Sequence, residues 1–427
     1  MQLFTEMTKE ELCAQAAKAR DIYDAYLRQG ISINMARGRP AAPQLDLSDP
    51  LMNLTKADTG FKAEDGSDVR NYGGLCGIPE ARRLFGEIFG VPADNVIVCG
   101  SSSLNLMYDY ISQCCSHGAL GSSPWSKTEA PKFVAVVPGY DRHFAIAEHF
   151  GLEMISVPMT PDGPDMDLLE EVVKDPSVKG MFCVPKYSNP DGITYSENTV
   201  RRLAAMQTGA ADFRVIWDEA YVVHDLYEEG DELANVFEIA KEYGTEDRFV
   251  AFASTSKITF AGAGVAAIAA SDANFSDIKA RMTVQIISYD KLNQLRHCKL
   301  YPSLTEIRAQ MKKHAAILRP KFEAVLNVLH AELDGCGIAS FNSPRGGYFI
   351  SLDVNVGSAK YVGELCKACG LTLTGVGATY PYGKDPADAN IRIAPSCPSV
   401  EELDTAARIL AAAVKLAACK ELGADVG

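Results

Sequence analysis

The run Ala253-Ser254-Thr255-Ser256-Lys257 is the most informative stretch of this chain. It closes the apolar run 249–253, which predicts a strand, and it places a lysine directly after hydroxyl side chains. A partly desolvated lysine amine in such a position is suited to bind an aldehyde covalently. Most lysines are solvated surface charges, so this run alone assigns no role to Lys257.

A second strand end carries an acid and a tyrosine. The apolar run 215–217 is followed by Asp218, and Tyr221 comes three residues later. The carboxyl ends of parallel strands meet at one edge of a sheet, where such folds bind ligands. There Asp218 can pair with a protonated ring nitrogen and Tyr221 can donate to an oxygen of the same ring. Asn189, after the strand-like run 180–184, belongs either to an ordinary turn or to the same edge.

The residues 95–103 predict a strand, a turn at Gly100 and a helix start. Three hydroxyl residues open that helix: Ser101, Ser102 and Ser103. Free amides at a helix N-terminus bind anions, whereas serine is also an ordinary helix cap. Capping explains one serine, so three in a row after a glycine favour a phosphate-binding turn.

In this order, the motifs resemble those of the fold-type I aminotransferases of the class I/II superfamily, and the resemblance covers most of the chain. Asn189, Asp218, Tyr221 and Lys257 fall on that family's Asn-Pro-x-Gly, Asp-x-x-Tyr and Ser-x-Ser-Lys motifs. The resemblance implies pyridoxal 5′-phosphate as cofactor and an α/β fold with a large, mostly parallel sheet between helices and a small α/β domain. It implies catalytic roles for Lys257, Asp218 and Tyr221. The implied cofactor ligands also include Asn189, Ser101, Ser102, Ser103, Ser254 and Ser256.

Further positions match the same family. Tyr140, after the apolar run 133–137, corresponds to the aromatic residue that stacks on the cofactor ring, although it also suits a turn. Tyr72 begins a Tyr-x-x-x-x-Gly segment whose tyrosine reaches the cofactor phosphate of the neighbouring subunit. The resemblance therefore implies a homodimer with shared active sites.

The substrate's α-carboxylate requires a cation, and a guanidinium fork suits it best. Arg392, in a strand-like run near the C-terminus, corresponds to the family's carboxylate-binding arginine, and Asn189 lies beside the substrate in that family. Gly38 matches an early glycine whose backbone approaches the substrate. Arg37 or Arg39 is a candidate for a second carboxylate, although both are equally compatible with solvated surface positions.

One departure concerns the phosphate. Many relatives have an arginine shortly after the lysine, where this chain has Gly264, so amides, hydroxyls, Tyr72 or a cation elsewhere must hold the phosphate. With the segments 290–297 and 44–48, the chain resembles the type Ic subgroup of bacterial aspartate aminotransferases. That implies amino-acid and 2-oxo-acid substrates, aspartate and 2-oxoglutarate, in a ping-pong reaction.

Two other functions stay open at this stage. The same fold hosts other transaminases, C–S lyases and decarboxylases, and fold alone does not fix the reaction. A non-catalytic regulatory protein with this fold would need a DNA-binding module, and only about thirty residues precede the Arg-Gly-x-Pro segment at 37–40.

Composition excludes several classes of partner. At 427 residues and 47% hydrophobic, the chain can bury a large core, and its net charge of −14 disfavours nucleic acid and anionic membranes. No run has the length of a membrane span, and the N-terminus lacks signal-peptide features, so we expect a cytoplasmic protein. The 12 cysteines predict reduced thiols, with the pair Cys366 and Cys369 on the apolar face of a helix and no metal site.

The pattern along the chain predicts three regions. Residues 1–50 form an N-terminal arm and part of a small domain, opening with a helix capped by Thr8. Residues 51–302, in which short β-rich runs alternate with helical stretches, form the large cofactor-binding domain. Residues 303–427 form the C-terminal small domain, and 118–131 is an insertion loop.

Overall fold

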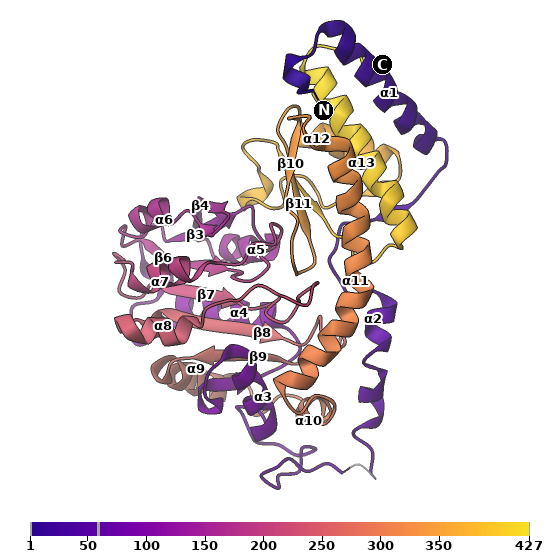
Figure 1. Ribbon diagram of the computed structural model, residues 1–427. Helices are drawn as coiled ribbons and strands as arrows, with labels where there is room; N and C mark the ends of the chain where they lie inside the picture. Colours follow the sequence, from indigo (N-terminus) through magenta and orange to yellow (C-terminus); the bar gives the residue numbers. More distant parts are fainter. Residues whose placement is uncertain (1, 58–59, 427) are drawn as a thin grey trace.

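The computed structural model describes residues 2–57 and 60–426, and its largest feature is an eight-stranded sheet (Figure 1). The central strands β4, β3, β6, β7 and β8 pair in parallel, while β5, β9 and β2 add antiparallel edges. In sheet order the strands are β2 (Val96–Val98), β9 (Ala266–Ala270), β8 (Phe249–Ser254), β7 (Arg214–Asp218), β6 (Val178–Cys183), β3 (Lys132–Val137), β4 (Glu153–Thr160) and β5 (Gly163–Pro164).

Helices cover both faces of this sheet. One face packs on α4 (Ser103–His117), α5 (Asp141–His149) and α9 (Asp272–Gln285). The other packs on α3 (Pro79–Phe89), α6 (Met166–Val172), α7 (Glu197–Ala205), α8 (Val236–Tyr243) and α10 (Lys291–Leu300). Because strand side chains alternate, Ile216 of β7 enters the first core and Val215 and Trp217 enter the second. The predicted fold is confirmed.

A smaller α/β unit packs beside the sheet. Its antiparallel strands are β10 (Ala339–Phe341), β11 (Ile350–Val354) and β13 (Asn390–Ile393), and its helices are α1 (Lys9–Leu27), α12 (Ala359–Ala368) and α13 (Val400–Glu421). Cys366 and Cys369 are buried in its core, and all twelve cysteines are free thiols. The prediction that the Cys-x-x-Cys pair packs in a core is therefore confirmed.

The predicted N-terminal helix begins with the expected capping box. The hydroxyl of Thr8 accepts from the amide of Glu11 at 3.2 Å, and the Glu11 carboxylate accepts from the amide of Thr8 at 2.7 Å. Leu12 and Tyr23 on its buried face join the small-domain core, so α1 packs with α13 at the top of Figure 1.

One long helix joins the two cores. In α11 (Leu304–Leu333), Ile307 and Met311 pack in the large-domain core, whereas Phe322 and Leu329 pack in the small-domain core. Figure 1 shows this helix, in orange, running from beside α10 to the strands of the small domain. Because α11 belongs to both cores, it links the large sheet to the small α/β unit, and the cavity described below lies between them.

The sequence did not reveal the shortest elements. These are β5, β10, the parallel pair β1 (Ile33–Asn34) and β12 (Leu371–Thr372), and the five-residue helix α2 (Ala42–Asp46). An element of two or three residues is too short to show a periodic pattern in the sequence. Its pairing depends on a partner far away in the chain. In the part of the chain that the structure describes, no helix is both long and apolar enough to span a membrane.

Candidate functional site

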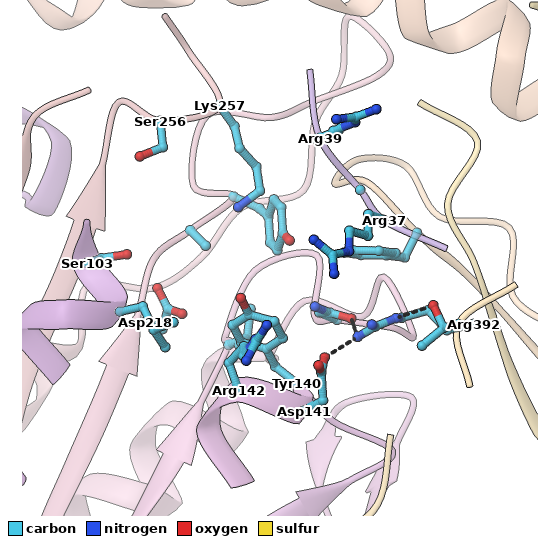
Figure 2. Close-up of a pocket in the computed structure, with 18 of the residues that line it drawn as sticks. Arg37, Arg39, Ser103, Tyr140, Asp141, Arg142, Asp218, Ser256, Lys257 and Arg392 are labelled. Atoms are coloured by element: carbon cyan, nitrogen blue, oxygen red, sulfur yellow. Dashed lines mark hydrogen bonds and ion pairs between the residues drawn. The ribbon is translucent and has the colours of Figure 1, made fainter. Parts of the chain in front are cut away.

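A cavity of about 690 Å³ opens at the carboxyl edge of the parallel strands (Figure 2). Its lining includes Tyr140 after β3, Asn189 after β6, Asp218 at the end of β7, and Ser254 at the end of β8. Lys257 follows on the turn after β8 and lines the same cavity. The structure thus brings together the side chains that the motifs placed at one edge.

Asp218 is buried, and only one of its carboxylate oxygens is hydrogen-bonded within the described residues. Its Oδ2 is 3.1 Å from Nε2 of His143, whereas its Oδ1 has no hydrogen-bond partner among the described residues. His143 is itself buried and stacks on Phe182, with ring centroids 4.4 Å apart. This fixes the carboxylate and leaves one oxygen for a donor from outside the protein. The sequence analysis missed His143, whose only signal was its place on the helix after Tyr140.

The amine of Lys257 lies over the ring of Tyr221, 4.8 Å from its centroid. Loss of hydration in the cavity lowers the pKa of this amine, while the charge of Asp218 opposes that shift. Burial raises the pKa of Tyr221 well above its usual value, so the hydroxyl stays protonated. The His224 ring packs edge-on against Tyr221, with ring centroids 5.6 Å apart, and burial followed by the Lys257 charge lowers the pKa of His224 well below the ordinary value. The amine therefore faces neutral neighbours on this side.

Hydroxyl groups gather on the side of the cavity away from Arg392 (Figure 2). Ser102, Ser103, Ser254 and Ser256 line it, and Ser102 caps α4 by accepting from the amide of Asn105. The hydroxyl of Ser254 donates to that of Ser256 at 3.1 Å. Together with the first turn of α4, these groups form a site suited to an anion.

Ser101 lies differently from its neighbours. Its side chain is not part of the cavity lining, and its carbonyl accepts a hydrogen bond of 2.9 Å from the hydroxyl of Ser256. The backbone of Ser101 thus positions Ser256, while its own hydroxyl is exposed to solvent.

Gly264 packs against the Ser256 backbone. A Cβ at this glycine would lie 3.0 Å from the Ser256 amide nitrogen, so an arginine there would displace Ser256. Three other cations of the large domain have partners of their own and do not line the cavity: Arg296 donates to Asn293 at 2.7 Å, and the Lys291 amine is 3.5 Å from the carbonyl of Tyr72. Lys186, in turn, pairs with Asp225 at 3.0 Å.

Arg392 forms the far wall of the cavity, and its guanidinium is already hydrogen-bonded. Its Nη1 donates to Asp141 at 2.8 Å and to Asn189 at 3.2 Å, and its Nε donates to Thr374 at 3.3 Å. The Asp141 carboxylate, about one third exposed (34%), forms an ion pair with this guanidinium inside the cavity (Figure 2). The sequence analysis missed Asp141 and Thr374, because neither carries a motif.

Gly38 supports Arg392 through an aromatic ring. The guanidinium lies 5.0 Å from the ring centroid of Phe349, and a Cβ at Gly38 would approach Cζ of that ring to 2.6 Å. Close packing with this ring, rather than an unusual backbone angle, therefore requires glycine here.

Tyr72 is placed away from its own subunit's cavity. Its side chain is 80% exposed and is not part of the lining. The described residues also contain no cluster of His, Cys, Asp or Glu that could hold a metal ion.

The chain also matches a known protein family. A model of the family described as aspartate amino-transferase matches residues 7–425. The chain belongs to the aspartate aminotransferase family. It is therefore an aminotransferase, as the sequence predicted. It is 48% identical over 400 residues to the aspartate aminotransferase of Corynebacterium glutamicum, covering 93% of this chain and 92% of that protein.

Solved structures of aminotransferases have the same fold. An aspartate transaminase from C. glutamicum superimposes with a TM-score of 0.95 at 46% identity, covering 97% of this chain and 98% of that one. An α-aminoadipate aminotransferase of Thermus thermophilus, in complex with N-(5′-phosphopyridoxyl)-L-leucine, gives a TM-score of 0.71 at 21% identity, covering 92% and 94%. The latter likeness shows the fold alone.

Three more arginines line the cavity of this aminotransferase. Arg37, Arg39 and Arg142 line it with exposed side chains, in a protein whose net charge is −14. Arg142 was not predicted. Such a concentration of positive charge at the mouth of a cleft attracts anionic ligands.

We expect Asp141→Asn to lower the KM of this aminotransferase for amino-acid substrates by about two- to fivefold. The substituted amide no longer competes as a charged group for Arg392. Steady-state kinetics at fixed ionic strength check this, with Glu148→Gln on the same helix as the control for loss of a surface charge. A rise in KM would mean instead that Asp141 holds Arg392 in place.

Gly38→Ala should lower kcat/KM by about 10- to 100-fold, because it displaces Phe349 and with it Arg392. Gly375→Ala is the matched control, since Gly375 lines the same cavity and its added Cβ would meet nothing within 4 Å. Equal activity of the two variants would show that the Phe349 ring adjusts without moving Arg392.

Proposed function

We propose that this aminotransferase uses pyridoxal 5′-phosphate to transfer the amino group of aspartate to 2-oxoglutarate. The observation that carries the proposal is the unpartnered Oδ1 of Asp218, buried in the same cavity as the desolvated amine of Lys257. Such a carboxylate suits a protonated pyridine nitrogen, and such an amine suits an aldehyde.

The remaining residues fit the rest of the cofactor. Tyr140 would stack on its ring, Tyr221 and Asn189 would donate to the phenolic oxygen, and the hydroxyls at the start of α4 and after β8 would receive the phosphate. When bound, pyridoxal phosphate supplies an electron sink for the carbanion formed at the amino acid's α-carbon. Asp218 favours that sink, because its charge keeps the ring nitrogen protonated.

Lys257 moves the proton. Its pKa is lowered by the loss of hydration, so more of the amine is unprotonated near neutral pH and able to remove the α-proton of the substrate. Tyr221 restricts where the amine can move, because Nζ lies over its ring. Arg392 and Asn189 would hold the α-carboxylate so that the α-hydrogen faces Nζ.

A dicarboxylic substrate suits the charges of the cavity. Arg392 can bind one carboxylate, and Arg37, Arg39 or Arg142 can bind the other. The relative named aspartate aminotransferase, at 48% identity over 93% of this chain, supports the same substrate class. We expect the enzyme to act in the cytoplasm.

We also propose a homodimer in which Tyr72 completes the neighbouring site. The side chain is 80% exposed, and two apolar side chains that precede Lys291 in the chain are exposed as well, Val284 (91%) and Ile287 (64%). Apolar side chains this exposed are typical of a protein interface. Lys291 supports the Tyr72 backbone, and so would help to direct this side chain toward a partner.

A screen of amino acids in single half-reactions tests the proposed substrates. Aspartate and glutamate should convert the cofactor's absorbance from the aldehyde to the amine form faster than alanine, leucine or 2-aminoadipate do. A lyase or a decarboxylase would instead release sulfide or carbon dioxide, and a regulatory protein would show no turnover. Fastest conversion with a neutral amino acid would overturn the dicarboxylate assignment.

Lys257→Ala should abolish covalent attachment of the cofactor and lower kcat by at least about 10²–10⁴-fold, since it removes the base. Lys257→Arg is the control that keeps a positive charge. The measurement is borohydride reduction followed by peptide mapping. Attachment of the cofactor to a different lysine in the wild-type protein would show that Lys257 is wrongly assigned.

Ser254→Ala and Tyr72→Phe should each weaken retention of pyridoxal phosphate, since a hydrogen bond to a charged group contributes about 1.5–3 kcal/mol, roughly 10- to 150-fold in Kd. Ser101→Ala is the comparison, and it should change retention little, because the Ser101 side chain lies outside the cavity. Equilibrium dialysis measures all three. Wild-type retention in both Ser254→Ala and Tyr72→Phe would mean that another group holds the phosphate.

A further inference from the structure

A second cavity, of about 630 Å³, lies at the edge of the sheet opposite to the catalytic residues. Its walls are the loop after α4 (119–123), the segments 208–214 and 244–248, and Lys179 on β6. Strand β7 begins at this cavity with Arg214 and ends at the other one with Asp218. We refer to it as the sheet-base cavity. None of its residues takes part in the proposed aminotransferase chemistry.

Arg214 is a buried cation without a counter-ion. The residue is only 4% exposed, and its Nε has no hydrogen-bond partner among the described residues. Its Nη1 donates to the carbonyl of Phe213 at 2.9 Å. The neighbouring groups of α4 are neutral, because burial raises the pKa of Cys114 to about 12 and that of Tyr110 well above its usual value. Burying a charge in this way is costly unless something compensates it.

Arg248 brings a second guanidinium to the same cavity. Its Nη1 donates to the carbonyls of Leu203 and Ala204 at 2.9 and 3.1 Å, at the end of α7. Burial, followed by the charge of Arg214, lowers the pKa of Arg248 to about 10. The two guanidinium groups line the same cavity and repel each other.

The acids of this cavity do not neutralise these arginines. Asp212 pairs with Lys179 at 3.0 Å, and the exposed Asp247 accepts from the hydroxyl of Ser271. Within residues 2–57 and 60–426, no ion pair joins Arg214 or Arg248 to a carboxylate. Two cationic charges are left facing an open cavity.

We propose that the sheet-base cavity binds a small phosphate-bearing anion between Arg214 and Arg248. A phosphate group carries a charge of about −1.5 to −2 near neutral pH, which matches two guanidinium groups, whereas a carboxylate compensates only one. The volume exceeds what a bare phosphate fills and lies within the range of about 300–1,000 Å³ that is usual for metabolite sites. The ligand class is therefore a small phosphate ester, with free phosphate as the other source of the same group.

Calorimetric titration of the holoenzyme, with its main site saturated by pyridoxal phosphate, tests this inference. The probes are inorganic phosphate and glycerol 3-phosphate, with acetate at the same ionic strength as the reference anion. Both phosphates should bind with measurable heat and raise Tm, while acetate should not. Tighter binding of the ester identifies a metabolite as the source, and tighter binding of inorganic phosphate identifies the free ion.

Two variants test whether phosphate binds in the sheet-base cavity. Arg248→Gln should weaken phosphate binding by about tenfold or more, since it removes a charged hydrogen-bond donor. Ala211→Glu leaves both arginines intact but adds a carboxylate at an exposed position of the lining, and it should abolish the phosphate-induced rise in Tm.

Arg201→Gln is the matched control, because it removes a cation that pairs with Glu197 and Glu242 outside the cavity. Its phosphate affinity should equal that of the wild type. Phosphate that binds no better than acetate, or binding unchanged in both Arg248→Gln and Ala211→Glu, would overturn the proposal. Neither result depends on the aminotransferase assay, so this inference and the proposed substrate pair fail separately.

Discussion

The proposed catalytic site depends on one buried carboxylate, of which a single oxygen has a hydrogen-bond partner. Asp218 ends β7 between two hydrophobic cores, where an unpaired charge is costly, and His143 accounts for only one side of it. The stacking of His143 on Phe182 keeps that contact rigid. A cationic ring nitrogen at the free oxygen would compensate the charge. This compensation would favour binding of the proposed cofactor.

The same carboxylate influences the amine across the cavity. Lost hydration lowers the pKa of Lys257, and the Asp218 charge limits how far that shift goes. Once a cationic ring is bound, much of the Asp218 charge is neutralised, and this support for the protonated amine weakens. In the proposed mechanism, cofactor binding and activation of the base would thus be coupled through one charge.

In the proposed function, substrate binding would change the ionic partner of Arg392. Arg392 belongs to β13 of the small domain, yet its Nη1 bonds to Asp141 and Asn189 of the large domain. A bound carboxylate would replace one of these contacts and keep the two domains linked. Since α11 contributes to both cores, movement of the small domain must bend this helix or rotate about it, and Pro320 lies inside it.

The sequence by itself determined the order of elements and the chemical types of residue at the strand ends. Asn189, Asp218, Tyr221 and Lys257 were predictable because a parallel sheet collects its strand ends at one edge, whatever the loops between them do. The central strands were predictable from their apolar runs.

Tertiary structure alone decided the contacts between distant segments. These include His143 with Asp218, Asp141 with Arg392, the ring of Phe349 against Gly38, and the separation of Ser101 from the serines that line the cavity. It also decided that Arg214 and Arg248 line one cavity without an ion pair to either of its acids, Asp212 and Asp247. The sequence gives the type of each side chain. Its partner depends on packing between residues tens to hundreds of positions apart, and no local sequence pattern predicts such a contact.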